Sequence, residues 1–441
     1  MNLTPNQNIM PITAKINNKG HLEIGGCDVV DLAEKYETPL YIYDEATIRQ
    51  ICSDYKTAFS TYPNVQPLFA SKAFLTKATC AIMQQEGFGL DAVSGGELYT
   101  AIQAGFDMSK VIFNGNNKSI DELQMALDAN IGRFSVDNFL ELSLLDNLAK
   151  SNNKNVKIFL RITPGIECHT HEYIQTGHLD SKFGFDLTQL DEAIELIKDE
   201  YSNLELVGLH AHIGSQIFEL KPYNDLVDVV FEEVARINNK FSLNLDEINL
   251  GGGLGIKYTG SDNPPSIFEA ADVIVGAINR NVEKFNFSPK IYIEPGRSVI
   301  GTSGVTIYTV GSSKQVPEGK KYVAVDGGMA DNIRVSMYQA EYHAMVANKA
   351  NDITEETVTI AGRFCESGDI LLKDISLPKL EEGDILCVFD TGAYCYAMSS
   401  NYNRVLKPAA IIVTNSKSDV IIKRETYEDL VSHDVVPAHL V

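Results

Sequence analysis

The sequence has few of the features that mark secreted, zinc-binding or membrane-embedded proteins. Its 441 residues include seven cysteines, which are odd in number, scattered and without a C-x-x-C pair. This usage argues against a disulfide framework and a zinc site, and it is typical of a reducing compartment. No apolar run approaches the length that spans a bilayer, and no basic segment followed by an apolar stretch opens the chain. We therefore expect a cytoplasmic protein with no membrane partner.

Positive charge is also scarce. The chain carries 37 Lys and Arg residues against 59 Asp and Glu residues, a formal net charge of −22. A surface this acidic repels nucleic acid and anionic lipid, so neither is expected as a partner. With 44% hydrophobic and 22% charged residues the composition is otherwise that of a globular protein, and the length exceeds one ordinary core. We expect two domains.

A repeated alternation of strand-like and helical segments fills the middle of the chain. Between the strand-like runs, Ser119-x-x-Glu122 is a capping box that opens a helix at 120–129, and Thr188 can cap a later helix. The apolar runs lie at 67–72, 87–93, 111–114, 131–136, 157–162, 206–213, 247–250 and 290–294. Eight such units predict an α/β fold, a parallel sheet closed into a TIM-like (β/α)8 barrel, with an open doubly wound sheet as the alternative.

The segments on either side of the barrel predict β structure. Residues 12–24 alternate around the turn Asn18-Lys19-Gly20, which predicts a hairpin. Because an isolated hairpin is marginal in water, we expect these N-terminal strands to complete a mainly antiparallel C-terminal β domain. That domain is indicated by runs at 305–310, 321–326, 356–361, 384–389 and 409–423. The predicted division of the chain is 1–44, 45–298 and 299–441.

Polar or glycine residues follow every predicted barrel strand, where such barrels carry their chemistry. Lys72 ends the first run, and a lysine in that position is a candidate Schiff-base nucleophile or a structural lysine. The loop at 163–188, with His169-Thr170-His171-Glu172, is long enough to line or cover a site. The other strand ends carry Asp91, Ser94, Asn114, Gly115, Asp137, Arg161, His212, Gly251-Gly252-Gly253 and Glu294-Pro295-Gly296-Arg297.

Three of these strand ends suggest a chemistry. The run Gly251-Gly252-Gly253-Leu254-Gly255 can bring backbone N–H groups to an anion such as phosphate, or it forms a tight turn. Glu294 and Arg297 form a local salt bridge, or they offer a carboxylate for a protonated ring nitrogen and a guanidinium for phosphate or carboxylate. His210 and His212 share one face of a strand, as a metal pair or as an imidazole stacked on a cofactor ring. No third ligand is evident, so no metal is expected.

The C-terminal β domain adds two motifs at strand ends, Cys365-Glu366-Ser367-Gly368-Asp369 and Gly392-Ala393-Tyr394. Cys365 with its acidic neighbour is a candidate proton donor, and an inert packed cysteine is the alternative. A lysine, a phosphate cradle, a carboxylate for a ring nitrogen and a stacking imidazole together describe a pyridoxal phosphate site.

These motifs, in this order and over essentially the whole length, resemble the fold-type III pyridoxal phosphate-dependent decarboxylases, and among them most closely the diaminopimelate decarboxylases of lysine biosynthesis. The resemblance implies pyridoxal 5′-phosphate as cofactor and a carboxy-lyase that converts meso-2,6-diaminopimelate to L-lysine through a Lys72 Schiff base. It rests on Phe69 to Ala73, Asn114 to Ser119, His171 to Gly177, Ser181 to Gly184, His210 to Gln216, the glycine run, Glu294 to Arg297, Cys365 to Asp369 and Gly392 to Tyr394.

The resemblance also implies a role for each matching residue. Lys72 would form the Schiff base, His212 would stack on the pyridine ring, and Glu294 would meet the ring nitrogen. Cys365 or Lys72 would return the proton. The phosphate would be surrounded by Ser215, Gly251, Gly252, Gly253, Gly296, Arg297 and Tyr394. The substrate would be bound by Arg297, Arg334, Tyr338, Glu366 and Tyr394, with Glu366 on the distal ammonium. Family members are homodimers with sites at the interface, so Cys365 and Glu366 would reach the partner's site.

Two positions depart from the family pattern. Phe74 stands where the family often has asparagine. Val335 follows Arg334 where proline is usual, so the backbone at Arg334 is less rigid.

Several other functions compete with diaminopimelate decarboxylation. They are an ornithine, arginine or carboxynorspermidine decarboxylase, a pyridoxal phosphate carrier, and a racemase of related fold. Arg334 with Glu366 favours a zwitterionic distal group, residues 299–441 argue against a carrier, and the Cys365 motif has no role in a racemase.

Overall fold

The computed structural model describes residues 3–166 and 181–441. The chain forms two compact units, each discontinuous in sequence. The first comprises Met1–Asn8, Arg49–Lys257 and Asp262–Ile300, and the second Ile9–Ile48, Tyr258–Ser261 and Gly301–Val441. The three-part division at residues 44 and 298 stays a prediction.

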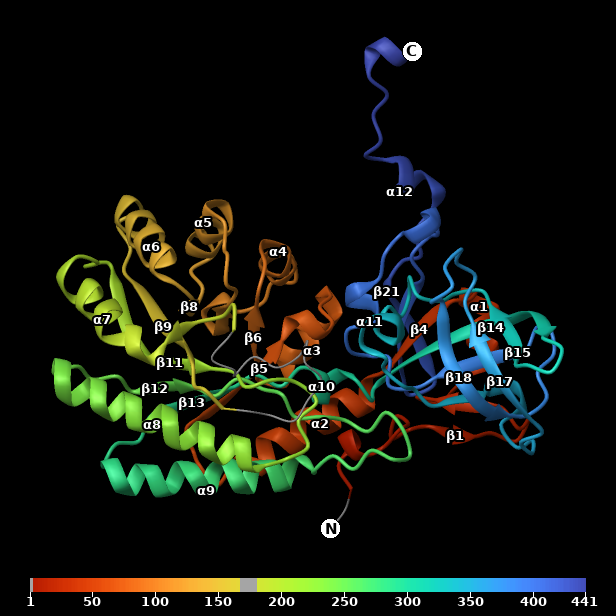
Figure 1. The fold of residues 1–441 in the computed structure, drawn as a ribbon, viewed down its shortest axis with the longest axis horizontal. Coiled ribbons are helices and arrows are strands. Elements are labelled where there is room, and N and C mark those ends of the chain that lie inside the picture. Colours follow the sequence, from red (N-terminus) through yellow and green to blue (C-terminus); the bar gives the residue numbers. More distant parts are fainter. Residues whose placement is uncertain (1–2, 167–180) are drawn as a thin grey trace. The chain divides into compact units, whose positions relative to one another are not determined.

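The first unit is the predicted (β/α)8 barrel (Figure 1). Its parallel strands pair in the order β5, β6, β7, β8, β9, β11, β12 and β13, and β13 pairs with β5 to close the sheet. They are β5 (Val65–Ala70), β6 (Gly89–Ala92), β7 (Val111–Phe113), β8 (Arg133–Val136), β9 (Val156–Thr163), β11 (Leu204–Ala211), β12 (Glu247–Asn249) and β13 (Lys290–Ile293), with the short β10 (Phe185–Asp186) beside β9. All eight predicted runs coincide with these strands, so the closed barrel is confirmed over the open sheet.

Helices follow the strands and surround the barrel (Figure 1). They are α2 (Glu45–Ala58), α3 (Lys77–Gln85), α4 (Gly95–Gln103), α5 (Ile120–Asp128), α6 (Phe139–Ser151), α7 (Leu190–Asp199), α8 (Lys221–Phe241), α9 (Ile267–Phe285) and the single turn α10 (Arg297–Ile300). The capping box at Ser119 and Glu122 is confirmed. The prediction that Thr188 caps a helix is wrong, because a 3-10 turn precedes α7 and Asp186 caps that turn by accepting from the Thr188 N–H.

The barrel interior is filled by side chains rather than open. A buried cluster joins five strands, and the ring of Phe159 meets that of Tyr292 edge-on with centroids 5.7 Å apart. Its members are Leu68, Ile112, Phe159, Val207 and Tyr292. Because these apolar side chains fill the middle of the barrel, the polar side chains of the same strands collect at their carboxyl ends.

The second unit is a mixed, mainly antiparallel β structure. Its large sheet has the order β18, β17, β15, β14, β4, β20 and β21, with β19 on β14 and β16 on β19. The strands are β4 (Leu40–Asp44), β14 (Gly304–Gln315), β15 (Lys321–Val325), β16 (Ala344–Val346), β17 (Glu356–Ala361), β18 (Ile370–Leu377), β19 (Ile385–Val388), β20 (Ala409–Thr414) and β21 (Lys417–Ile422). The N-terminal strand β4 pairs with both β14 and β20, so the expectation that N-terminal strands complete this unit is confirmed.

The predicted N-terminal hairpin is present as β1 (Lys15–Ile16) and β2 (Leu22–Ile24), which pair antiparallel. With β3 (Cys27–Asp28) it forms a small sheet of its own, followed by α1 (Val29–Tyr36). The hairpin side chains Leu22 and Ile24 share a buried core with strands β4, β14 and β20. The hairpin thus joins the β unit by packing, while β4 joins it by hydrogen bonds.

The remaining helices of the second unit are short. They are α11 (Arg334–Tyr338) and α12 (Tyr427–Val431). Single 3-10 turns occur along the chain as η1 (Pro5–Gln7), η2 (Ser71–Ala73), η3 (Met108–Lys110), η5 (Leu187–Gln189), η6 (Ala347–Lys349), η7 (Tyr396–Met398), η8 (Tyr402–Arg404) and η9 (Ala438–Leu440). Among the described residues, no helix is both long enough and apolar enough to cross a membrane.

Candidate active site

The barrel brings the polar strand ends predicted from the sequence to one rim. Lys72 lies in η2, the turn directly after β5, and its side chain is exposed there. Its charge acts on carboxyl groups from β6, α4 and β13, and on two imidazoles from β11 and the residue after it. Because such effects require proximity, the lysine predicted as nucleophile lies among the groups predicted to serve it.

Glu294 is a buried carboxylate at the end of β13, and three side chains surround it. Its Oε1 accepts hydrogen bonds from Asn249 Nδ2 at 2.7 Å and from Asn114 Nδ2 at 3.2 Å. Its Oε2 lies 3.4 Å from His210 Nε2. Burial alone would raise the pKa of Glu294, but His210, the Lys72 charge and the Asn249 amide lower it well below its usual range. The carboxylate therefore stays ionised at neutral pH.

Two further carboxyl groups near Lys72 have raised pKa values, whereas that of Glu294 is lowered. Burial and the charge of Glu294 raise the pKa of Asp91 to about 8, although Asn114 donates to its Oδ1. Burial raises the pKa of Glu97 to about 7, although its Oε2 accepts from the Val93 N–H at 2.6 Å. The rim therefore holds one firmly ionised carboxylate beside two groups that exchange protons near neutral pH.

His212 is held against the glycine run that follows β12. Its Nδ1 lies 3.2 Å from the Gly252 N–H, which donates to it. Burial and the charge of Lys72 lower the pKa of His212 well below 6.5, so the ring is neutral. A Cβ on Gly251 would lie 2.7 Å from the same Nδ1, and Gly251 has a φ of +65°. Glycine is needed there because the imidazole approaches the backbone so closely.

The glycine run also packs against neighbouring loops. A Cβ on Gly252 would lie 2.1 Å from the carbonyl oxygen of Glu294, and one on Gly253 would lie 2.4 Å from that of Gly214. After the next strand, a Cβ on Gly296 would lie 2.9 Å from the Cβ of Ala70, just before Lys72. Small residues therefore let these three βα loops converge on one rim.

Ser215 and Arg297 form a hydrogen-bonded pair on this rim. The guanidinium of Arg297 donates to Ser215 Oγ through Nη2 at 2.9 Å and Nε at 3.3 Å. Glu294 accepts its hydrogen bonds from other strand ends, at Asn249 and Asn114. A guanidinium beside a hydroxyl, on the rim that also carries the glycine run, is a suitable environment for a phosphate.

In the second unit, Arg334 is held by aromatic side chains. Its Nη1 donates to Tyr342 Oη at 2.6 Å and to Tyr258 Oη at 3.0 Å. The guanidinium carbon also lies 5.9 Å from the ring centre of Tyr338, the last residue of α11. Arg334 is buried, which by itself would lower its pKa, but Tyr258 and Tyr342 raise the pKa, so the guanidinium stays charged in a fixed position.

The other predicted residues of the second unit lie in two turns. Cys365 and Glu366 are exposed, and the turn is shaped by Asp369, whose carboxylate accepts from the N–H groups of Phe364 at 2.8 Å and Met329 at 2.7 Å. Tyr394 has a φ of +65°, a strained value for a tyrosine.

Some predictions concern residues outside the described part of the chain. These are His169 to Glu172 in the predicted loop and the motif His171 to Gly177. Within residues 3–166 and 181–441, no cluster of three His, Cys, Asp or Glu side chains is suited to a metal ion. His210 and His212 have different neighbours, Glu294 and the Gly252 N–H, so the described residues favour imidazole roles other than a metal pair.

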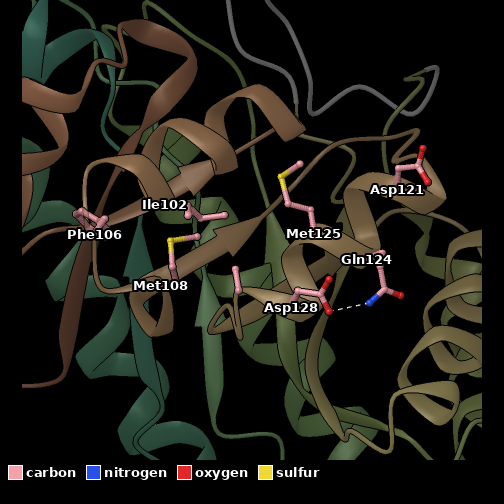
Figure 2. A pocket seen from close by; sticks show the side chains of 8 residues that line it. Ile102, Phe106, Met108, Asp121, Gln124, Met125 and Asp128 are labelled. Carbon is pink, nitrogen blue, oxygen red and sulfur yellow. Dashed lines mark hydrogen bonds between the residues drawn. The ribbon is translucent and has the colours of Figure 1, made fainter.

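A hollow on the outside of the barrel lies between α4 and α5, and it is distinct from this rim (Figure 2). It has a volume of about 620 Å³ and an apolar wall with carboxylates at its edge. Gln124 donates to Asp128 across one helical turn at 2.8 Å. Its lining residues are Ile102, Phe106, Met108, Asp121, Gln124, Met125, Asp128 and Ala129. None of the candidate residues lines it.

Four residues of the site carry no role in the sequence-based prediction. Asn249 holds Glu294, Asn114 links Asp91 to Glu294, and Tyr258 and Tyr342 hold Arg334. A polar residue inside the apolar run Ile248-Asn249-Leu250 was a usable signal for the first. The sequence around the two tyrosines gives no such signal. Tyr258 is far from Arg334 along the chain, and Tyr342 lies on an irregular segment.

Comparison with known proteins agrees with this geometry. A family model described as the pyridoxal binding domain of pyridoxal-dependent decarboxylases matches residues 45–301. The diaminopimelate decarboxylase of Bacillus subtilis (strain 168) is 49% identical over 427 residues, 96% of this chain and 97% of that protein. That of Synechocystis sp. is 50% identical over 449 residues, 99% of this chain and 95% of that protein. The structure of diaminopimelate decarboxylase from M. jannaschii with L-lysine has a TM-score of 0.91 at 34% identity, covering 98% of this chain and 99% of that one.

The closed barrel, with its lysine, buried glutamate and glycine run, is that of a pyridoxal phosphate-dependent decarboxylase. The identity to the curated relatives extends over nearly the full length of both chains. The chain belongs to the diaminopimelate decarboxylase family. A lysine/ornithine decarboxylase from Vibrio vulnificus, 22% identical with a TM-score of 0.75, shares the fold alone.

The cofactor of this family is pyridoxal 5′-phosphate, and the barrel residues fit it. An ionised, buried carboxylate such as Glu294 suits a protonated pyridine nitrogen. The glycine run brings its backbone to the rim, where a side chain at Gly252 or Gly253 would collide with Glu294 or Gly214. The Ser215–Arg297 pair adds the positive charge that a phosphate requires.

Proposed function

We propose that the protein decarboxylates meso-2,6-diaminopimelate to L-lysine with pyridoxal phosphate as cofactor. The observation that carries the proposal is the convergence of the Lys72 charge, the ionised Glu294 and the neutral His212 at the carboxyl ends of the barrel strands. The near-full-length identity to diaminopimelate decarboxylases supports the choice of substrate.

Different barrel residues would hold different parts of the cofactor. Lys72 would bind its aldehyde carbon through Nζ, and Glu294 would accept a hydrogen bond from the ring nitrogen and keep it protonated. His212, neutral and held by the Gly252 N–H, would stack on the ring. The phosphate would be bound by Ser215, Gly251, Gly252, Gly253, Gly296, Arg297 and Tyr394. When bound, the cofactor supplies an electron sink for the charge left by the departing carbon dioxide.

The residues of the second unit would select the substrate. Arg334 and Tyr338, with Arg297, would bind the distal carboxylate, and Glu366 would bind the distal ammonium. A substrate without that second amino-acid head leaves these groups unpaired, which penalises it by about 1–3 kcal/mol for each unsatisfied group. Ornithine and lysine are therefore expected to be poor substrates.

After decarboxylation a proton must return to the α-carbon. Cys365 Sγ and Lys72 Nζ are the two candidate donors. If Cys365 is the donor, Cys365→Ala slows turnover while the cofactor still binds to Lys72. If Lys72 is the donor, Cys365→Ala turns over normally.

We further propose a homodimer in which Cys365 and Glu366 serve the partner's site, and a cytoplasmic location. Support for the first is the exposure of the turn that carries both residues. Support for the second is that the six described cysteines, one of them exposed, are all free thiols, the state that a reducing compartment maintains.

The proposal is tested by turnover of the purified protein with pyridoxal phosphate. Carbon dioxide release is followed side by side with meso-diaminopimelate, ornithine and lysine. Release from meso-diaminopimelate alone is expected, and Lys72→Ala should abolish it. Release mainly from ornithine or lysine would overturn the roles of Arg334 and Glu366. Normal turnover by Lys72→Ala would overturn the assignment of the nucleophile.

A further inference from the structure

A buried chain of three side chains leads from β8 through β11 to the carboxylate of Glu294. Ser135 Oγ lies 2.7 Å from His210 Nδ1, and His210 Nε2 lies 3.4 Å from Glu294 Oε2. Ser135 is fully buried and His210 is 1% exposed. The roles proposed above use Glu294 but neither Ser135 nor His210.

The neighbours of His210 determine which ring nitrogen carries the proton. A carboxylate faces Nε2, and a lone pair there would oppose a negative oxygen in a site without water to screen them. A proton on Nε2 turns this contact into an attraction. Nδ1 is then an acceptor, and the Ser135 hydroxyl can donate to it. One tautomer therefore suits both contacts: a hydrogen bond from Ser135 to Nδ1, and an electrostatic contact from Nε2–H to Oε2, whose atoms lie 3.4 Å apart, outside hydrogen-bond geometry.

The charged groups around His210 support a neutral ring. Burial lowers the pKa of His210, and the charges of Arg161 and Lys72 lower it further, while Glu294 opposes them. Asp137, after β8, also interacts electrostatically with His210. A neutral imidazole with a fixed tautomer offers Glu294 one directed N–H rather than a mobile charge.

The two oxygens of Glu294 are held from different sides. Oε1 accepts from the amides of Asn249 and Asn114, and Oε2 faces His210. The amides alone would leave rotation of the carboxylate plane less restricted. A polarised N–H facing the second oxygen restrains that plane electrostatically, and therefore the direction in which Glu294 presents its lone pairs.

We propose that His210 is a positioning residue for Glu294: its proton lies on Nε2, facing Oε2, in the tautomer that the carboxylate favours and that the Ser135 hydroxyl accommodates by donating to Nδ1. His210 acts through Glu294 and does not contact the substrate. The inference rests on the proposed function only in so far as Glu294 serves the ring nitrogen.

The tautomer is tested on the cofactor-free protein with ¹⁵N-labelled histidine. The His210 resonances are assigned by their loss in His210→Gln. The expected result is a neutral ring with the proton on Nε2 in the wild-type chain. A proton on Nδ1, or a mixture of tautomers, in the wild-type chain would overturn the proposal. Neither result depends on decarboxylation, so the tautomer proposal and the proposed function can fail separately.

The action on Glu294 is tested with two amide variants of His210 in the enzyme loaded with pyridoxal phosphate. The amide nitrogen of Gln can take the place of Nε2, whereas that of Asn can take only the place of Nδ1. His210→Asn is expected to lower kcat about tenfold with KM nearly unchanged, and to shift the absorbance of the bound cofactor towards the unprotonated ring. His210→Gln is expected to restore much of both.

The control is Ile194→Val, a buried change in α7 on the outside of the barrel, which should leave kcat and the spectrum unchanged. Equal behaviour of the Asn and Gln variants, or a KM effect without a spectral shift, would refute the proposal. Should the variants fail to fold, the tautomer measured on the wild-type chain still decides it.

Discussion

Asp91 and Glu294 show how two carboxyl groups at one rim acquire opposite protonation states. They share the side-chain amide of Asn114, which donates to both. Glu294 also receives Asn249, faces His210 and is held ionised, whereas burial and the neighbouring charge keep Asp91 protonated to about pH 8. The two groups lie on strand ends far apart in sequence, so their local residues give no sign of this difference.

Asp91→Asn should change how stability depends on pH. Because the folded pKa of Asp91 is about 8 and the ordinary value is 3.8, its contribution to stability is complete below about pH 4. That contribution is lost as the pH rises through about 8. Asn keeps an acceptor for Asn114 and does not ionise, so the cofactor-free variant should gain at least about 1 kcal/mol on the wild type between pH 5 and pH 9. Denaturant unfolding at both pH values measures this.

The matched control for Asp91 is Asp272→Asn, which removes an exposed carboxyl group on α9. It should unfold with nearly the same pH dependence as the wild type. A constant difference between Asp91→Asn and the wild type at pH 5, 7 and 9 would contradict the raised pKa.

Tyr342→Phe should weaken substrate binding without affecting the cofactor. The change removes the hydroxyl that accepts from Arg334 Nη1 at 2.6 Å. A hydrogen bond to a charged group contributes about 1.5–3 kcal/mol, so KM for meso-diaminopimelate should rise about tenfold or more. Cofactor affinity, measured by absorbance titration, should not change. Tyr99→Phe on the exposed face of α4 is the control, and an unchanged KM in Tyr342→Phe would exclude this role.

At the scale of residues, the sequence predicts which residues form the site but not which side chains hold them in place. Lys72, Glu294 and the glycine run could be recognised because each has a motif of its own. The holding of Arg334 by Tyr258 and of Glu294 by Asn249 depends on contacts between separate elements. Local pattern contains no information on such contacts.

At the scale of elements, the glycine run after β12 is a turn that only glycine can form. Gly253 has a φ of +113°, and its Cβ position is 2.4 Å from the carbonyl oxygen of Gly214. Gly253→Ala should therefore displace the turn and lower the affinity for pyridoxal phosphate at least about tenfold, since strain of this kind costs about 1–3 kcal/mol. Absorbance titration of the cofactor-free protein is the measurement.

The control for Gly253 is Gly276→Ala in the middle of α9, where the nearest atom to the new Cβ is Arg280 Nη1 at 3.8 Å. Alanine stabilises a helix interior by about 0.5–1 kcal/mol relative to glycine, so this variant should bind cofactor normally and unfold at the same or a higher temperature. Equal cofactor affinity in both variants would show that the turn is not part of the phosphate site.

The barrel elements could be predicted because each strand is a short apolar run followed by a helical pattern. The β unit gave weaker signals. The sequence does not predict strand β18, because Lys373 and Asp374 interrupt its apolar residues, or β16, because it has only three residues. Thr188 precedes a helical stripe, as a cap does, but Asp186 provides the cap of the preceding turn.

At the scale of the whole molecule, the proposed contribution of Cys365 and Glu366 to the partner's site can be tested by co-expressing two chains with different inactivating substitutions. Lys72→Ala is co-expressed with a chain carrying Cys365→Ala and Glu366→Ala. If the sites are shared, half of the dimers are mixed and each has one intact site, so about a quarter of the wild-type activity should return. If each site uses one chain alone, no activity returns.

A reciprocal control places all three substitutions in one chain and co-expresses it with the wild type. With shared sites the mixed dimers are inactive, because each site then has a defect, and about a quarter of the activity remains. With separate sites about half remains. The two experiments together distinguish shared sites from a failure of the chains to mix.

Strand β4 makes the order of synthesis important for this protein. Its five residues are buried between β14 and β20 in the finished sheet, yet the entire barrel is encoded between β4 and these partners. A ribosome therefore releases β4 long before β14, and longer still before β20. Until then an apolar segment with unpaired backbone groups is exposed on the nascent chain, while the barrel strands find most of their neighbours within a few tens of residues. We expect the N-terminal segment to be the part of the nascent chain that most needs a chaperone.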